Sequence, residues 1–275
     1  EALAGVFICL LKDAKDRKGA VTIRDLQDKI QDEDVFRKER RSHVEVVVRN
    51  QDGMRDLYKL VTKSNTSSLA VMGKATGKEG VDVAAEARVL RSDIQKARNN
   101  LLIGSSCLNG ELFELAANGD DARLKEAMAF YDYVEVQPLG NYSTMIAMNS
   151  LPSVDRLKTV IRRLISTAKE MGIPVIADSD AHYCRPEQKI FRDVYIMSQG
   201  VGGATHPLYI RDENLRRKTK NPDQHIRLTG EMLQEFAWLN DEKHIEEIVL
   251  DNPEKLFDLI EDGIHPVPDG TFAPH

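Results

Sequence analysis

The stretch Ile173-Pro-Val-Ile-Ala-Asp-Ser-Asp-Ala-His-Tyr183 decides how the rest of the chain is interpreted. Its apolar run, Pro174–Ala177, predicts a short buried strand. The run leads into three side chains that can bind metal ions, namely Asp178, Asp180 and His182. Side chains two positions apart in extended chain point to the same side. We therefore expect Asp180 and His182 to face together at the carboxyl end of a strand, where α/β folds place their chemistry.

The Asp-x-His spacing of Asp180 and His182 has two interpretations. It offers one oxygen ligand and one nitrogen ligand to a single divalent cation. Alternatively, Asp180 caps a turn and His182 is half exposed in a polar loop. The buried strand predicted in front of the pair favours the metal site, and both interpretations stay open on spacing alone.

Composition limits the class of protein. The chain has 275 residues, enough for one large domain or two small ones with a buried core. Apolar residues make up 41% and charged residues 30%, which is typical of a soluble globular protein. The net charge of −6 excludes a generic nucleic-acid binder held by bulk positive charge, so any contact with DNA has to be local.

The cysteines and the first residues of the chain predict the cellular compartment of the protein. Cys9, Cys107 and Cys184 are few and irregularly spaced, which argues against a disulfide framework and predicts a reducing, cytoplasmic location. No run of about eighteen apolar residues occurs, so no membrane span is expected. The first ten residues lack the features of a signal peptide, and the missing initiator Met suggests a segment of a longer chain.

Hydrophobic periodicity predicts alternating strands and helices. The expected strands are Val6–Leu11 (or the start of a buried helix), His43–Val48, Leu101–Gly104, Tyr133–Val136 and the opening run. The expected helices are Thr22–Ile30 with Thr22 as N-cap, Met54–Thr62, Val81–Ala97, Leu112–Ala117, Ala122–Ala129, Val154–Met171, Lys189–Ser198, Thr229–Phe236 with Thr229 as N-cap, His244–Leu250, and Pro253–Glu261 with Asn252 as cap. Exposed loops are expected at Asp32–Arg41, Thr66–Gly80 and Gln199–Asp223. The alternation predicts an α/β fold with parallel strands.

Metal-capable side chains recur at the predicted strand ends. His43 begins one strand and Cys107 follows another, as Asp180 and His182 follow the opening strand. Strand ends of an α/β fold converge on one face, so these four residues are candidates for one site. Taken singly, Cys107 fits a small buried residue and His43 a capping or core histidine.

Other side chains are less specific. Glu135, within a predicted strand, is either a ligand or an outward-facing or paired carboxylate, and Cys184 is expected to point away from the site. Arg216-Arg-Lys218 with Lys220 and Arg227 forms a basic patch that either contacts a phosphate backbone or is a solvated loop.

Several stretches together resemble a known family. They are Ser42-His-Val-Glu-Val-Val-Val-Arg-Asn50, Leu57-Tyr-Lys-Leu-Val61, Leu101-Leu-Ile-Gly-Ser-Ser-Cys-Leu-Asn-Gly-Glu111, Phe130-Tyr-Asp-Tyr-Val-Glu-Val-Gln-Pro138, Pro174–Tyr183, Arg227–Leu239 and Ile248–Asn252. In this order they resemble the PHP (polymerase and histidinol phosphatase) domain of bacterial DNA polymerase III alpha subunits, of the PolC type.

The resemblance implies a fold and a set of ligands. PHP domains are distorted, TIM-like β/α barrels whose strand ends bind divalent metals. His43, Cys107, Asp180 and His182 match the last four ligands, and the earlier ligands have no match here. Where PolC-type chains often carry Asn, this chain has Asp180. The implied metal is zinc, manganese or magnesium.

The resemblance also implies an organisation. In PolC-type chains a 3′–5′ exonuclease is inserted within the PHP domain. Residues 1–264 resemble the portion after this insertion, and residues 265–275 lead toward a polymerase core. The implied partners are the rest of the polymerase chain, DNA through that chain, and other replisome subunits.

Two functional hypotheses follow. In the first, the chain is a structural module of a replicative polymerase, supports DNA-directed DNA synthesis, and holds a partial metal site that does not catalyse alone. In the second, it is a stand-alone metal-dependent phosphoesterase, with the same four residues as ligands. The second needs a complete ligand set within the chain, and the count of matched ligands favours the first.

Overall fold

The computed structural model describes residues 2–19, 21, 22, 25, 40–76, 80–198, 206–267 and 270, with backbone alone at 2, 3, 18, 71–76 and 80–84. Most of the predicted helix Thr22–Ile30 and of the predicted loop Asp32–Arg41 lies outside these residues. The predicted N-cap of this helix, Thr22, is among the described residues. The amide of Asp25 donates to Thr22 Oγ1 at 3.1 Å, and the amide of Thr22 donates to Asp25 Oδ2 at 2.8 Å, as expected for a helix start.

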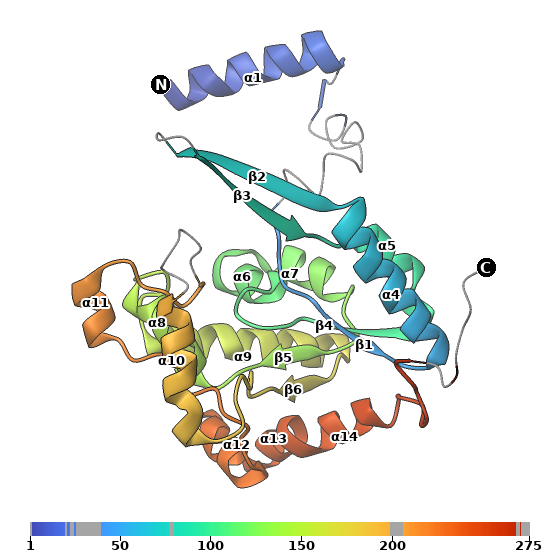
Figure 1. The fold of residues 1–275 in the computed structure, drawn as a ribbon, viewed down its shortest axis with the longest axis vertical. Coiled ribbons are helices and arrows are strands. Elements are labelled where there is room, and N and C mark those ends of the chain that lie inside the picture. The colour runs from blue at the N-terminus through green and yellow to red at the C-terminus, as the bar shows by residue number, and fades with distance from the viewer. Residues whose placement is uncertain are drawn as a thin grey trace. The chain divides into compact units, whose positions relative to one another are not determined.

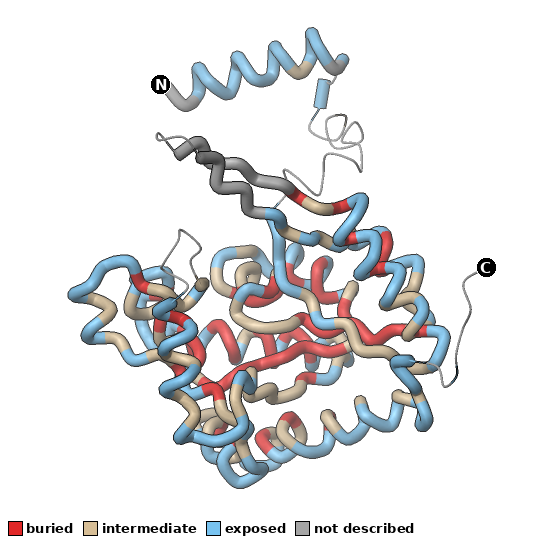
Figure 2. Tube along the Cα trace, in the orientation of Figure 1, coloured by how far each residue is buried: buried red, intermediate tan, exposed pale blue. Residues whose placement is uncertain are grey.

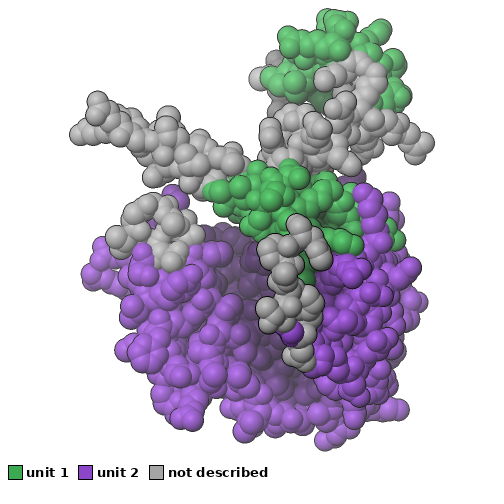
Figure 3. Space-filling model, turned by 45° about the vertical axis from the view of Figure 1, so that its right-hand side comes forward, with its two compact units in different colours: residues 1–41, 58–95 green, residues 42–57, 96–275 purple. Residues whose placement is uncertain are grey.

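The chain divides into two compact units. The first comprises Glu1–Arg41 and Tyr58–Gln95, and the second comprises Ser42–Leu57 and Lys96–His275 (Figure 3). Helix α4 (Gln51–Thr66) begins in the second unit and ends in the first. All four predicted metal ligands fall within the second unit, so the candidate site belongs to that unit.

In the first unit, Val6–Leu11 lies within helix α1 (Ala2–Lys18), so the helix alternative of the prediction is right and the strand alternative is wrong. The prediction of burial is wrong, because Val6, Phe7, Ile8 and Leu10 are all more than half exposed. The apolar run is long enough for a helix, and nothing in the described part of the chain covers it.

The first unit also contains an antiparallel hairpin where a loop and a helix were predicted. Strand β2 (Leu69–Thr76) pairs with β3 (Gly80–Ala87) from Leu69↔Ala87 to Thr76↔Gly80. Helix α5 (Arg91–Lys96) is all that remains of the predicted helix Val81–Ala97. Val81, Val83, Ala85 and Ala87 of β3 recur at every second position, which is the period of a strand. The Gly, Ser and Thr residues of Thr66–Gly80 predict a loop, and cross-strand pairing overrides that composition.

The second unit is built on two strand pairs. Strand β1 (Glu45–Val48) pairs antiparallel with β4 (Leu101–Gly104), and β5 (Val134–Val136) pairs parallel with β6 (Val175–Ala177) (Figure 1). An isolated bridge between Gly104 and Tyr133 joins the two pairs. The predicted α/β class is confirmed. The predicted parallel arrangement is right for β5 and β6 and wrong for β1 and β4, because the long connection between β1 and β4 permits either direction.

Helix α9 (Val154–Met171) supplies the largest share of the core. It begins at Ser153, whose hydroxyl accepts from the amide of Arg156, and it ends at Gly172 in a left-handed conformation. Its buried face contacts α6, β5 and β6 and appears red in Figure 2. That face consists of Leu157, Val160, Ile161, Leu164, Ile165 and Ala168. The helix therefore covers the parallel strand pair, as its periodicity predicts.

The other helices of this unit agree largely with prediction. They are α6 (Glu111–Asn118), α7 (Asp121–Met128), α10 (Lys189–Ser198), α12 (Thr229–Phe236), α13 (Glu242–Glu246) followed by one π-helical turn (Glu247–Asp251), and α14 (Asn252–Phe257). Helix α8 (Ser143–Ala147) is not among the predicted helices. An additional helix, α11 (Glu213–Lys218), lies within the predicted loop Gln199–Asp223. It forms because Asp212 caps it, accepting from the amide of Leu215 at 2.9 Å.

Two predicted caps have other roles. Thr229 is the first residue of α12 rather than its cap, and the carboxylate of Glu231 accepts from the amide of Leu228. Asn252 is buried, and its side chain donates to the carbonyl of Val175 at 2.9 Å. Asn252 therefore joins the C-terminal helices to β6, a contact that local sequence does not reveal.

The contribution of the α9 core can be tested with Ile161→Ala. Ile161 has no solvent exposure, so the variant should lose about 2–5 kcal/mol of unfolding free energy in urea denaturation. Val154→Ala in the same helix changes a 44%-exposed side chain and should cost no more than about 0.5 kcal/mol. Equal losses in the two variants would mean that this face of α9 is not buried.

Candidate metal centre

The four predicted ligands line one cavity. His43 precedes β1, Cys107 follows β4, and Asp180 and His182 follow β6. All four contribute to the wall of a cavity of about 380 Å³ in the second unit. Convergence of strand ends, expected from the sequence, therefore brings residues from three separate segments to one place.

The first pair is His43 and Cys107, whose Nδ1 and Sγ atoms are 3.3 Å apart. The backbone holds them together, since the amide of His43 donates to the carbonyl of Asn109 and the amide of Gly110 donates to the carbonyl of Cys107. Gly110 permits this tight loop, because a Cβ there would lie 2.3 Å from the carbonyl oxygen of Ser105. The loop after β4 thus places the thiol beside the imidazole.

Burial raises the pKa of the Cys107 thiol above its usual value, and the negative charge of Asp180 raises it further. In the absence of a cation this thiol keeps its proton, so it is not set up as a nucleophile. A bound divalent cation would displace the proton, which is how thiols become metal ligands.

The second pair is Asp180 and His182, with Oδ1 and Nε2 3.4 Å apart. The expected extended geometry is wrong, because Asp180 has φ 52° and the chain turns there. Gln224 joins the pair instead. Its side chain donates to Asp180 Oδ2 at 2.7 Å, and its carbonyl accepts from the amide of His182 at 2.7 Å. The two residues face together because a distant segment holds them.

Asp178 has a different role from its neighbours. Its carboxylate accepts from the amide of Asp180 at 3.0 Å and from the side chain of Gln137 at 3.4 Å, and it does not line the cavity. Burial raises its pKa above the usual value. Asp178 therefore shapes the turn that presents Asp180.

The four residues form two pairs rather than one tight cluster. Within the described residues, no set of three or more His, Cys, Asp or Glu side chains is close enough to hold one metal ion. Each pair separation nevertheless matches that of two neighbouring ligands on a tetrahedral cation, which lie roughly 3.3–3.6 Å apart. The donor set of nitrogen, sulfur and oxygen suits zinc, and the carboxylate also suits manganese or magnesium.

Several cavity residues were not predicted. Arg192, on α10, and His206 have no motif around them, and Asn141, Thr144 and Gln224 come from loops and short helices. Burial lowers the pKa of His206, and the charge of Arg192 lowers it further, so His206 is neutral at pH 7. Their positions depend on tertiary structure, and the sequence offers no signal for them.

Some buried polar atoms in the cavity wall lack a hydrogen-bond partner among the described residues. They are Asn141 Oδ1, Thr144 Oγ1, Arg192 Nε and Gln224 Oε1. Buried polar atoms are usually satisfied, by protein, water or ligand. The wall is therefore suited to a polar or charged occupant.

Glu135 is a paired carboxylate, the second of its two predicted alternatives. It is 5% exposed on β5, its Oε1 accepts from the amide of Ser106 at 2.9 Å, and it hydrogen-bonds with Glu45. Burial, followed by the charge and hydrogen bond of Glu45, raises the pKa of Glu135 to about 9. Glu135 does not line the cavity.

The other side chains singled out in the sequence, Cys184 and the basic patch, lie outside the wall of this cavity. Cys184 is exposed and outside the cavity wall, as expected. The predicted basic patch is only partly right, because Arg227 has 3% side-chain exposure and pairs with Glu235. No helix in the described ranges combines the length and apolarity needed to span a membrane.

Glu135→Gln tests the protonation of the buried acid. Between its usual range near 4.5 and about 9, the folded state binds one more proton than the unfolded state, so stability falls as pH rises. The amide mimics the protonated acid, so the variant should lose less stability than the parent between pH 5 and pH 9 in urea titrations. Glu126→Gln, at an exposed position of α7, is the control. Parallel curves for parent and Glu135→Gln would contradict the assignment.

Gly110→Ala tests the loop that holds Cys107. A Cβ lying 2.3 Å from a backbone oxygen forces the loop to move, and we expect a loss of about 1–3 kcal/mol in unfolding free energy. In Gly230→Ala, by contrast, the new Cβ in α12 meets nothing within 4 Å, and this change should be neutral or stabilising. A Gly110→Ala variant as stable as Gly230→Ala would show that the close approach is not required.

Comparison with known proteins adds a relationship for the whole chain. No protein-family profile matches it. The chain is 34% identical over 274 residues to DNA polymerase III PolC-type of Lacticaseibacillus paracasei, and 33% identical over 274 residues to the protein of the same name from Halalkalibacterium halodurans. It is 32% identical over 275 residues to that of Lactococcus lactis. Each match covers 100% of this chain.

The chain spans 16–17% of the length of these relatives. It is therefore similar, along its whole length, to one segment of PolC-type DNA polymerase III. The predicted relationship to a PolC-type polymerase is confirmed.

Proposed function

We propose that this chain, similar throughout to a segment of PolC-type DNA polymerase III, is the later portion of a PHP domain in a replicative polymerase alpha subunit. In this proposal it forms part of a distorted β/α barrel and supports DNA-directed DNA synthesis without catalysing that reaction. The nucleotidyltransferase and 3′–5′ exonuclease sites belong to other segments of the longer polypeptide. Its partners are the rest of that polypeptide, DNA through it, and other replisome subunits in the cytoplasm.

One observation carries the proposal. His43, Cys107, Asp180 and His182 come from three segments far apart in the sequence, and they line one cavity in the order that the PHP resemblance implies. Four chemically suitable side chains at strand ends are more than a general α/β fold requires. Their convergence supports a divalent-metal site.

The pair separations fit a cation, as described above, and the cation would be held by His43 with Cys107 and by Asp180 with His182. When bound, it would supply a positive charge that links the loops around β1, β4 and β6. The residues of this chain supply the supports, since Gln224 orients Asp180 and Gly110 lets Cys107 approach His43. Such outer supports govern how tightly a metal is held.

The site is partial in this proposal. The earlier ligands implied by the PHP resemblance have no match in the sequence, and the two pairs do not form a three-residue cluster among the described residues. A loosely closed set of ligands favours a structural contribution over independent turnover.

A second candidate function is a stand-alone metal-dependent phosphoesterase. It is favoured by Arg192, whose Nε lacks a hydrogen-bond partner in the cavity wall within the described structure. An arginine facing a metal site is suited to a phosphate oxygen. The two functions differ in whether turnover occurs.

Metal content and turnover of the purified chain distinguish them. After dialysis against zinc or manganese, the parent should retain metal by inductively coupled plasma mass spectrometry. Asp180→Ala should weaken retention about tenfold or more, since loss of an outer support alone has that effect. Asp155→Ala, at an exposed position in the first turn of α9, should leave retention unchanged.

The same samples are then assayed with bis-p-nitrophenyl phosphate. We expect no turnover above background for any variant, because the ligand set is partial. Strong turnover of the parent that is lost in Asp180→Ala would overturn the structural role and establish the phosphoesterase. Equal metal retention in Asp180→Ala and Asp155→Ala would contradict the proposed metal site.

A further inference from the structure

Helix α10 of the second unit has its apolar side turned outward. Ile190, Phe191, Val194 and Tyr195 follow the i, i+1, i+4, i+5 spacing that places side chains on one face of a helix. Their exposed fractions run from 49% for Tyr195 to 71% for Phe191. A surface helix normally turns such a face toward the core, as α9 does. The amphipathic pattern of α10 is therefore reversed.

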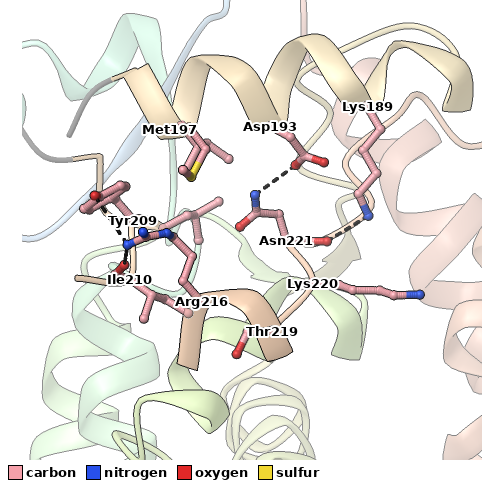
Figure 4. A pocket seen from close by; sticks show the side chains of 11 residues that line it. Lys189, Asp193, Met197, Tyr209, Ile210, Arg216, Thr219, Lys220 and Asn221 are labelled. Carbon is pink, nitrogen blue, oxygen red and sulfur yellow. Dashed lines mark hydrogen bonds between the residues drawn. The ribbon is translucent and has the colours of Figure 1, made fainter. Parts of the chain in front are cut away.

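The inward side of α10 carries charged side chains instead. Lys189 donates to the carbonyl of Asn221 at 2.8 Å and forms an ion pair with Asp223. The side chain of Asn221 donates to Asp193 Oδ1 at 2.9 Å. Figure 4 shows Lys189 and Asp193 pointing from the helix toward Asn221. These contacts fix the rotation of the helix, because turning it to bury the apolar face would break them.

A second cavity, of about 510 Å³, lies on this inward side of the helix. Its wall comes from α10, residues 208–210, α11 and residues 219–221. Leu208 lines both this cavity and the one that holds the candidate ligands. The inward side of α10 is thus engaged with its own unit, and the outer face is the side left for a partner.

The outer face of α10, defined by those four side chains, is large for an exposed apolar surface. It leaves on the order of 500 Å² in contact with water, near the top of the range of about 300–600 Å² for the largest apolar patch of a monomer. A partner of equal extent would bury about 1,000 Å² in total, less than the roughly 1,200–2,000 Å² of stable complexes between separate molecules. Interfaces between domains of one chain bury about 600–1,500 Å², which includes this value.

We propose that the outer face of α10 packs against an apolar surface of another segment of the same longer polypeptide. This inference rests on the proposed function, in which the chain is one segment of a polymerase chain. The chain spans 16–17% of the length of its relatives, so in a polypeptide of that kind most of the surface that can cover α10 lies outside these residues. A covalent connection raises the effective concentration of the two surfaces, so a face of this size is sufficient.

Two other occupants fit less well. A second copy of this chain would have to associate through a small interface without the help of a covalent connection, whereas obligate homodimers bury about 2,000 Å² or more. A nucleic-acid backbone requires positive charge on the protein surface, and the four side chains of this face carry none. The size and the lack of charge therefore favour an apolar surface within the same polypeptide.

Photocrosslinking in the full-length polypeptide that contains this chain tests the proposal. Phe191 is replaced by p-benzoylphenylalanine, and mass spectrometry after irradiation identifies the peptide joined to it. We expect a peptide from outside the 275 residues, joined within a single polypeptide of unchanged mass. The same probe in place of Glu126, on the exposed polar side of α7, is the control and should give about tenfold less of such a product.

Substitutions at Val194 sharpen the test. Combined with the probe at Phe191, Val194→Asp should lower the yield about tenfold or more, because the new charge would lose its water in an apolar interface. Val194→Leu should keep the yield of the parent. A product with a second copy, a product confined to the 275 residues, no product at all, equal yields at Phe191 and Glu126, or an unchanged yield in Val194→Asp would each overturn the proposal.

Metal content of the same samples separates this inference from the proposed function. Metal retained without the crosslinked product rejects the packing of α10 alone. The product without retained metal supports the packing and rejects the metal site alone.

Discussion

Burial of the apolar face of α9 against the parallel strands is the constraint on which the second unit depends. Each large side chain of that face contributes about 1.5–3 kcal/mol when it leaves water. Arg163, on the same helix, donates to the carbonyls of Ala116 and Gly119, so it also ends α6 and positions the start of α7. Without this layer, β5 and β6 would lose their cover, and the loop carrying Asp180 would lose its support.

The cavity lined by the four candidate ligands is assembled by contacts between distant segments. Gln224 reaches both residues of the second pair, and Gly110 allows the loop after β4 to close on His43. Neither residue is a plausible ligand, yet each determines where ligands point. The candidate ligands are recognisable in the sequence, whereas the residues that position them are recognisable only in the fold.

The two cavities share a wall and differ in chemistry. The first presents imidazoles, a thiol and a carboxylate, which are ligands for a cation. The second is lined by side chains of α10, α11 and the residues beside them, with Arg216 next to the Tyr209 ring (Figure 4). Leu208 contributes to both, so an occupant of one cavity adjoins the other. Residues between 206 and 221 thus line both cavities.

Local sequence determined the elements with strong periodicity. Helix α9, strand β4 and helix α10 have the bounds that their patterns predict, because each pattern extends over a whole element. The four candidate ligands were also identified from the sequence, since their residue types and their positions after apolar runs are local properties. The hairpin of β2 and β3 was missed, because pairing between strands stabilises segments whose composition resembles a loop.

Only the tertiary structure decided how those ligands meet. The chain turns at Asp180, and Gln224 rather than an extended backbone holds Asp180 and His182 side by side. Arg227 is buried against Glu235 and so does not belong to the basic patch. The tertiary structure also brought Arg192 and His206 to the cavity lined by the candidate ligands. The physical reason is the same throughout. Hydrogen bonds and charge pairs between distant segments depend on which surfaces pack together, and packing is a property of the folded chain rather than of any local pattern.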